Sequence, residues 1–113
     1  MQFFFIHLKG SLVAIHVKDI CYVQALAHHV KIVTDNGTFI PHVCLKQLEE
    51  KLPSGLFTRV NRGTLVSLSR VVSFNRDEII LKNGRFSFTD KYRKEFREKV
   101  TVLMNADTKQ AVK

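Results

Sequence analysis

The sequence is short of acidic residues and of cysteine. It has 10 Asp and Glu against 18 Lys and Arg, which gives a net charge of +8 at neutral pH. A basic surplus of this size makes a polyanion the first partner to consider. Only two cysteines occur, Cys21 and Cys44, too few for a secreted domain held together by disulfides. We therefore expect a reducing, cytoplasmic environment.

Long apolar runs are also missing. The apolar run in MQFFFIHLKG ends at His7, and no basic residue precedes it, so it does not match a signal peptide. No run approaches the roughly 20 apolar residues that a membrane-spanning helix needs. We therefore expect no membrane attachment.

The motifs of several common enzyme classes are absent as well. The sequence contains no G-x-x-x-x-G-K-[ST], G-x-G-x-x-G, H-E-x-x-H or G-x-S-x-G. His28, His29, His42 and Cys44 carry side chains that zinc prefers, but their spacing fits no recurrent zinc motif. We expect no enzymatic activity and no cofactor or metal, and a metal-dependent enzyme ranks third among the alternatives.

The length of 113 residues fits one ordinary domain with one modest core. The hydrophobic fraction of 45% and the charged fraction of 25% are those of a folded globular chain. No linker rich in Gly, Ser or Pro divides the sequence. We expect a single domain over residues 1–104, followed by a frayed tail over residues 105–113.

The apolar residues come in short runs separated by turn signals, which indicates many short strands. The two Asn-Gly pairs, at 36–37 and 83–84, predict type I′ hairpin turns, which need positive φ at both central residues. Strands are expected at residues 3–8, 12–17, 20–26, 29–34, 38–41, 57–60, 64–68, 71–74, 78–81 and 85–88.

Two segments have helical spacing instead. CLKQLEEKL, near residues 44–52, precedes Pro53 and predicts a short helix. DKYRKEFREKVTVLM, near residues 90–104, predicts a C-terminal helix with an apolar stripe. That stripe consists of Tyr92, Phe96, Val100 and Leu103. The fold class is therefore mainly β with two helices.

The basic residues fall mainly at predicted strand ends and turns. If these ends gather on one edge, they form a cationic rim that follows phosphates, with Asn61 and Arg62 able to reach base edges. The rim residues are Lys31, Arg59, Arg62, Arg70, Arg76, Lys82, Arg85 and Lys91.

Three segments resemble the LytTR DNA-binding domain, the output domain of many bacterial response regulators. They are VKDICYVQALAHHVKIVTDNG, CLKQLEEKLPSGLFTRVNRGTLVSLSRV and RFSFTDKYRKEF. The middle segment is the most specific, because it fixes a helix, a Leu-Pro stop, a Phe and two arginines in register. The resemblance runs from about Phe3 to Val100.

This resemblance implies an elongated fold of short, mostly antiparallel sheets that reads double-stranded DNA sequence-selectively with loops. It implies a role in transcription regulation, as in a two-component system. The implied partners besides DNA are an upstream receiver domain or sensor kinase system, and a second copy of the chain on repeated sites. By position it places DNA contacts at His29, Arg62 and Lys91, and the full candidate set is His29, Lys31, Asn61, Arg62, Lys91 and Arg93.

Arg59 matches the first arginine of the family motif and has a different expected role. It lies two residues after Phe57, on the same strand face as an expected core residue. Its stem is therefore expected to pack and its head to pair with a carboxylate or a carbonyl.

The sequence also departs from the family pattern. Around Arg62, the family usually has His, Ser and Tyr where this sequence has Asn61, Gly63 and Thr64. Ser67 stands where the family has Asn, and Cys44 stands where a Ser cap is expected. Asp90 stands where a basic residue is common. A carboxylate at Asp90 would repel a nearby phosphate. These departures keep a second alternative open, a LytTR-like module for protein interaction or ligand sensing that binds DNA weakly.

Overall fold

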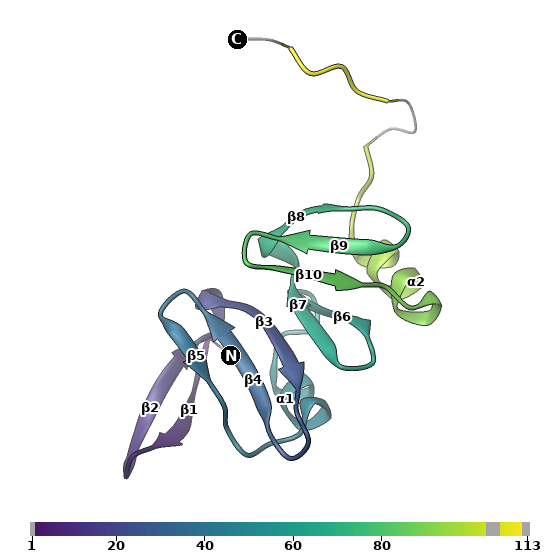
Figure 1. The fold of residues 1–113 in the computed structure, drawn as a ribbon. Helices are drawn as coiled ribbons and strands as arrows, with labels where there is room; N and C mark the ends of the chain where they lie inside the picture. Colours follow the sequence, from purple (N-terminus) through teal and green to yellow (C-terminus); the bar gives the residue numbers. More distant parts are fainter. Residues whose placement is uncertain (1, 104–106, 112–113) are drawn as a thin grey trace.

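A computed structural model describes residues 2–103 and 107–111 (Figure 1). Within these residues the chain forms ten β-strands in three antiparallel sheets, together with two α-helices. The Cα atoms extend over 53 × 35 × 22 Å. The predicted fold class, mainly β with short antiparallel sheets in an elongated arrangement, is confirmed.

The N-terminal sheet is a hairpin of β1 (Phe3–Leu8) and β2 (Ser11–His16). Leu8 pairs with Ser11, so the two-residue loop is Lys9-Gly10. Lys9 has φ +51° and Gly10 φ +82°, and Lys9 is the one non-glycine residue with positive φ in the described chain. This loop therefore has the two left-handed residues that a tight hairpin requires.

The central sheet has five strands in the order β5-β4-β3-β7-β6. A short 3-10 turn, η1 (Val17–Asp19), leads into this sheet, and α1 (Leu45–Lys51) separates β5 from β6. The helix lies within the predicted range 44–52. The strands are β3 (Ile20–Ala25), β4 (Val30–Thr34), β5 (Gly37–Phe39), β6 (Phe57–Asn61) and β7 (Thr64–Ser67).

The C-terminal sheet has three strands in the order β10-β9-β8. A second 3-10 turn, η2 (Leu68–Arg70), connects β7 to this sheet, and α2 (Asp90–Lys99) follows it. In Figure 1 this sheet and α2 lie on the far side of β6 and β7 from the N-terminal hairpin. The strands are β8 (Val71–Phe74), β9 (Glu78–Leu81) and β10 (Gly84–Ser87).

The central sheet is buried on both faces. Val23 and Leu65 belong to one apolar cluster, which includes the buried leucines of α1 and residues of the N-terminal hairpin. Their neighbours Tyr22 and Val66 belong to a second cluster with the three-stranded sheet and Phe96 of α2. Successive side chains of a strand point to opposite faces, so the sheet contributes residues to one cluster on each face.

The predicted type I′ turn at Asn36-Gly37 is wrong. Thr34 pairs with Gly37, so the loop residues are Asp35 and Asn36, and Asn36 does not have positive φ. The Thr34 hydroxyl holds this turn: it donates to the Gly37 carbonyl oxygen at 2.8 Å and accepts from the Asn36 N–H at 3.1 Å. A side-chain hydrogen bond thus shifts the turn by one residue.

The same prediction is wrong at Asn83-Gly84. Leu81 pairs with Gly84, the loop residues are Lys82 and Asn83, and neither loop residue has positive φ. Glycine is needed at position 84 because there is no room for a Cβ atom. A Cβ atom there would lie 2.6 Å from the Phe86 ring, which packs edge-on against Tyr22 at 4.7 Å between centroids.

The C-terminal helix is shorter than the predicted range 90–104. It ends at Lys99, and Val100 has extended backbone angles. Lys99 Nζ donates to the carbonyl oxygens of Ser54 and Phe57 at 3.1 and 2.9 Å, and β-branched residues follow it, which disfavour helix. Leu103, predicted for the apolar stripe, is 90% exposed. Residue 104 and part of the predicted tail lie outside the described residues.

Candidate nucleic-acid interface

Three loops meet along one edge of the molecule: the β3–β4 loop, the β6–β7 turn and the segment that enters α2 (Figure 1). The Leu26 N–H donates to the His29 carbonyl at 2.8 Å and closes the β3–β4 loop. The Ala25 N–H donates to the Gly63 carbonyl at 2.9 Å and joins this loop to the β6–β7 turn. The first two loops are therefore fixed relative to each other.

Asn61 joins the β6–β7 turn to the entry of α2. Its Nδ2 donates to the Ser87 carbonyl at 2.9 Å, and its Oδ1 accepts from the Gly63 N–H at 3.0 Å. The Thr89 N–H adds a bond to the Val60 carbonyl at 3.2 Å. Asn61 thus uses its carbonyl oxygen and one N–H to hold the edge together, and its contact with DNA stays a prediction.

Lys31 belongs to the same row of the sheet as Asn61. Across the strands Lys31 pairs with Gln24, Gln24 with Thr64, and Thr64 with Asn61. Cross-strand partners point to the same face, here the face toward the three-stranded sheet. Lys31 Nζ lies 5.9 Å from the centroid of the Tyr22 ring on that face.

The two arginines of the motif point to different surroundings. Arg62 is exposed at the β6–β7 turn, and no hydrogen bond or ion pair holds its guanidinium within residues 2–103 and 107–111. Arg59 is only 14% exposed, and its Nε lies 3.2 Å from Glu49 Oε1 of α1 in an ion pair that is not aligned as a hydrogen bond. The Arg59 guanidinium also donates to the Arg62 carbonyl. The prediction that the head of Arg59 pairs with a carboxylate or a carbonyl is confirmed, because it contacts one of each.

His29 is exposed at the end of the β3–β4 loop. Its ring stacks on that of His42, with 4.8 Å between centroids and 28° between planes. His42 comes from the segment between β5 and α1. The β3–β4 loop and this segment therefore bring two stacked imidazoles next to the loop edge.

The first turn of α2 carries three candidate charges. Lys91 is exposed, with Nζ 5.1 Å from the Tyr92 ring centroid. Arg93 donates from Nη1 to Asp90 Oδ1 at 2.7 Å and from Nε to the Arg76 carbonyl at 2.6 Å. The Arg93 hydrogen bond and charge lower the pKa of Asp90. Asp90 is therefore ionised but neutralised by Arg93, which leaves Lys91 as the exposed cation of this turn.

Comparison with known proteins identifies the family. A model of the LytTr DNA-binding domain matches residues 10–101. The chain belongs to this LytTR family. The match covers all three loops of the edge.

Individual relatives support the assignment. The LytTR domain is similar to the sensory transduction protein LytT of Bacillus anthracis, with 29% identity over 97 residues. This match covers 80% of the chain and 39% of LytT, so the chain spans about two fifths of that relative. The chain is also similar to the heme-containing CO-sensing transcriptional regulator RcoM 2 of Paraburkholderia xenovorans, with 33% identity over 67 residues. This second match covers 59% of the chain and 25% of the regulator.

A solved LytTr DNA-binding domain from Bacillus cereus has the same fold. The TM-score is 0.75 at 17% identity, and the match covers 88% of this chain and 96% of that structure.

Not all basic residues of the LytTR domain gather at the loop edge. Arg70 makes a two-pronged ion pair with Asp35, with both N to O distances 2.7 Å, and donates to the Lys18 carbonyl at 2.7 Å. The hydrogen bond from Arg70 lowers the pKa of Asp35, and Lys82 adds to this effect. Arg70 therefore contacts the β4–β5 turn, at the other end of the sheet. Lys82, in the β9–β10 turn, follows Leu81, which pairs with Val71 next to Arg70. The expectation of a single rim is wrong for these two residues.

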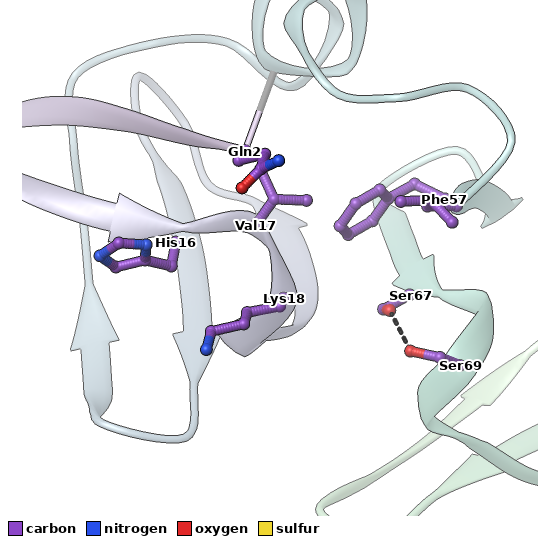
Figure 2. Close-up of a pocket in the computed structure, with 8 residues that line it drawn as sticks. Gln2, His16, Val17, Lys18, Phe57, Ser67 and Ser69 are labelled. Carbon is purple, nitrogen blue, oxygen red and sulfur yellow. Dashed lines mark hydrogen bonds between the residues drawn. The ribbon is translucent and has the colours of Figure 1, made fainter.

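A pocket lies at that other end (Figure 2). It has a volume of about 450 Å³ and is lined by residues that include Lys18, Phe57 and Ser67. Ser67 Oγ lies 3.2 Å from Ser69 Oγ. Ser67 ends β7, whereas Thr64 begins it at the loop edge, so the departure at Ser67 lies away from the candidate interface.

The described residues contain neither a cluster of metal-binding side chains nor a membrane-spanning helix. Across the described residues, no three His, Cys, Asp or Glu side chains lie close enough together to hold a metal ion. No helix in the same part of the chain is long and apolar enough to cross a membrane.

Proposed function

We propose that this LytTR domain binds double-stranded DNA sequence-selectively with the edge formed by the β3–β4 loop, the β6–β7 turn and the first turn of α2. The observation that carries the proposal is the chain of hydrogen bonds along this edge. The Ala25 to Gly63 bond and the Asn61 to Ser87 bond fix three loops that lie far apart in the sequence. An edge held in this way is preorganised for a ligand.

Each candidate residue has a separate role in this proposal. Arg62 is exposed, and its planar fork pairs with O6 and N7 of guanine in the major groove. His29 and Lys91, from the loops on either side, contact the phosphate backbone and set the register. Asn61 positions the turn, while Lys31 and Arg93 add positive charge next to it.

At the level of the whole protein, we propose a bacterial transcription regulator of which this domain is the DNA-binding output part. Relatives named as a sensory transduction protein and as a transcriptional regulator support this role. A receiver domain or a sensor kinase system upstream, a homodimer on repeated sites and a cytoplasmic location belong to the same proposal. Binding, not catalysis, is the activity to test.

A selection of bound sequences from random duplexes, followed by a salt titration, tests the proposal. Each neutralised phosphate contributes about −0.9 to the slope of log K against log salt, so four to six contacts give a slope of about −4 to −5. Arg62→Ala should lose selectivity. The control is Lys18→Ala, which removes the same charge from an exposed side chain at the other end of the sheet and should leave selectivity unchanged.

No binding at low salt, or binding without salt dependence, would contradict the DNA proposal. It would favour the alternative of a protein-interaction or ligand-sensing module.

A further inference from the structure

A groove of about 740 Å³ lies between the N-terminal hairpin, the segment between β5 and α1, and α1 itself. Its floor includes Ile6 of β1, Ile32 of β4 and Leu48 of α1, and all three are buried. Ile40 forms part of its wall and is 54% exposed. Grooves of this size and apolar character are typical of small-molecule sites.

The polar side chains that line this groove are hydrogen-bond donors without a negative charge among them. The lining includes Lys51 of α1 and the histidines His7, His29 and His42. No Asp or Glu is among the thirteen lining residues. The helix α1 has two acidic residues, Glu49 and Glu50; Glu49 pairs with Arg59, and neither lines the groove. The groove therefore complements an anion at its rim and an apolar body at its floor.

We propose that this groove binds a small organic anion with an apolar body, such as an arylalkyl or medium-chain carboxylate. The apolar body covers Ile6, Ile32 and Leu48. The carboxylate lies at the stacked imidazoles of His29 and His42, within reach of Lys51. A charge-assisted hydrogen bond from these donors gives the preference for an anion over a neutral analogue.

The position of His29 connects this groove to the loop edge. His29 lines the groove and closes the β3–β4 loop through its carbonyl oxygen. A carboxylate bound to its imidazole withdraws that side chain from phosphate and adds negative charge beside it. Ligand binding therefore weakens DNA binding. This coupling rests on the proposed function, whereas the binding of a carboxylate in the groove is independent of it.

Calorimetric titration of the chain with 4-phenylbutyrate and with octanoate, each beside its neutral amide, tests occupation without DNA. The carboxylates should bind saturably at one site and about tenfold more tightly than the amides. Absence of saturable binding by both carboxylates, or equal binding of the amides, overturns the proposal.

Two matched variants locate the site. Ile40→Asp adds a carboxylate to the groove wall and should abolish binding of 4-phenylbutyrate. Val72→Asp adds the same charge to β8, at a residue that is 67% exposed and outside the groove, and should bind as wild type. Melting temperatures verify that both variants fold. If Ile40→Asp binds normally, or Val72→Asp loses binding equally, the groove is not the site.

A DNA arm separates the two proposals. In wild type, 4-phenylbutyrate should raise the Kd for DNA several-fold, and in Ile40→Asp it should not. If the chain binds no DNA while the calorimetric results hold, the proposed function fails and the groove stands. If DNA is bound and the carboxylate binds without changing its Kd, the coupling through His29 is wrong.

Discussion

Asp90 and Arg93 form an ion pair within the first turn of α2, with Arg93 Nη1 2.7 Å from Asp90 Oδ1. The Arg93 side chain is partly buried and also donates to the Arg76 carbonyl, whereas the Asp90 side chain is almost fully exposed. The pair therefore places a carboxylate at the proposed DNA-binding edge and at the same time occupies a guanidinium that would otherwise be available to phosphate. The charges of the two side chains cancel, so the net positive charge of this turn comes from Lys91.

Replacing Asp90 by Asn should tighten DNA binding. The substitution removes one negative charge from the edge and releases Arg93 Nη1, an effect of up to about 1 kcal/mol, roughly fivefold in affinity at low salt. Fluorescence anisotropy with a selected duplex measures it. Asp107→Asn raises the net charge equally outside the edge and should have little effect; equal gains in both variants would mean that only net charge matters.

Arg62→Ala should weaken specific DNA binding by about 1 to 3 kcal/mol and relax selectivity. The melting temperature should stay nearly unchanged, because the Arg62 side chain is exposed. Competition binding with selected and scrambled duplexes measures the loss of selectivity. As a comparison, Lys91→Ala should weaken binding to all sequences alike and reduce the salt slope by about one. A selective loss in Lys91→Ala and a uniform loss in Arg62→Ala would reverse the two roles.

Arg59→Ala should act on stability first. The Arg59 side chain is largely buried, and its head contacts Glu49 and the Arg62 carbonyl. We expect a loss of about 1 to 3 kcal/mol in the free energy of unfolding, measured by urea denaturation. Glu49→Gln, which keeps the size of the side chain and removes its charge, should lower the free energy of unfolding less than Arg59→Ala does. A stable Arg59→Ala protein without DNA selectivity would show that Arg59 acts in recognition, by direct contact or by holding the Arg62 carbonyl, and not first in stability.

The ion pair of Asp35 and Arg70 should make stability depend on pH in the acidic range. Because Arg70 lowers the pKa of Asp35 in the folded state, the pair stabilises above the unfolded value of about 4. This contribution is lost as the pH falls through the lower, folded pKa. The stability difference between wild type and Asp35→Asn should therefore shrink from about pH 6 to pH 3 in thermal melts. A difference that is constant over this range would show that the charge of Asp35 does not contribute.

Gly84→Ala should destabilise the fold, because the added Cβ would lie 2.6 Å from the Phe86 ring, which Tyr22 holds in place. We expect a cost of about 1 to 3 kcal/mol, the usual range for overpacking, in urea denaturation. At Gly55 an added Cβ meets nothing within 4 Å, so Gly55→Ala is the control and should be neutral or slightly stabilising. Equal effects at both positions would mean that backbone entropy, not space, explains Gly84.

Local patterns predicted the strands and the first helix well, because burial on a sheet or helix imposes a short repeat on the sequence. They failed where a single side chain decided a boundary. The Thr34 hydroxyl shifts the β4–β5 turn, and the contacts of Lys99 with Ser54 and Phe57 accompany the early end of α2. These partners lie outside the short window that a pattern covers.

The sequence by itself determined the basic surplus, the order of the short strands and the arginine pair of the LytTR motif, because these are properties of composition and of neighbouring residues. Only the tertiary structure decided which basic residues share an edge. The bonds from Ala25 to Gly63 and from Asn61 to Ser87 bring three loops together, while Asp35 holds Arg70 at the other end of the sheet. Sheet order sets these pairings across 26 to 38 positions of sequence, and no local repeat encodes that order.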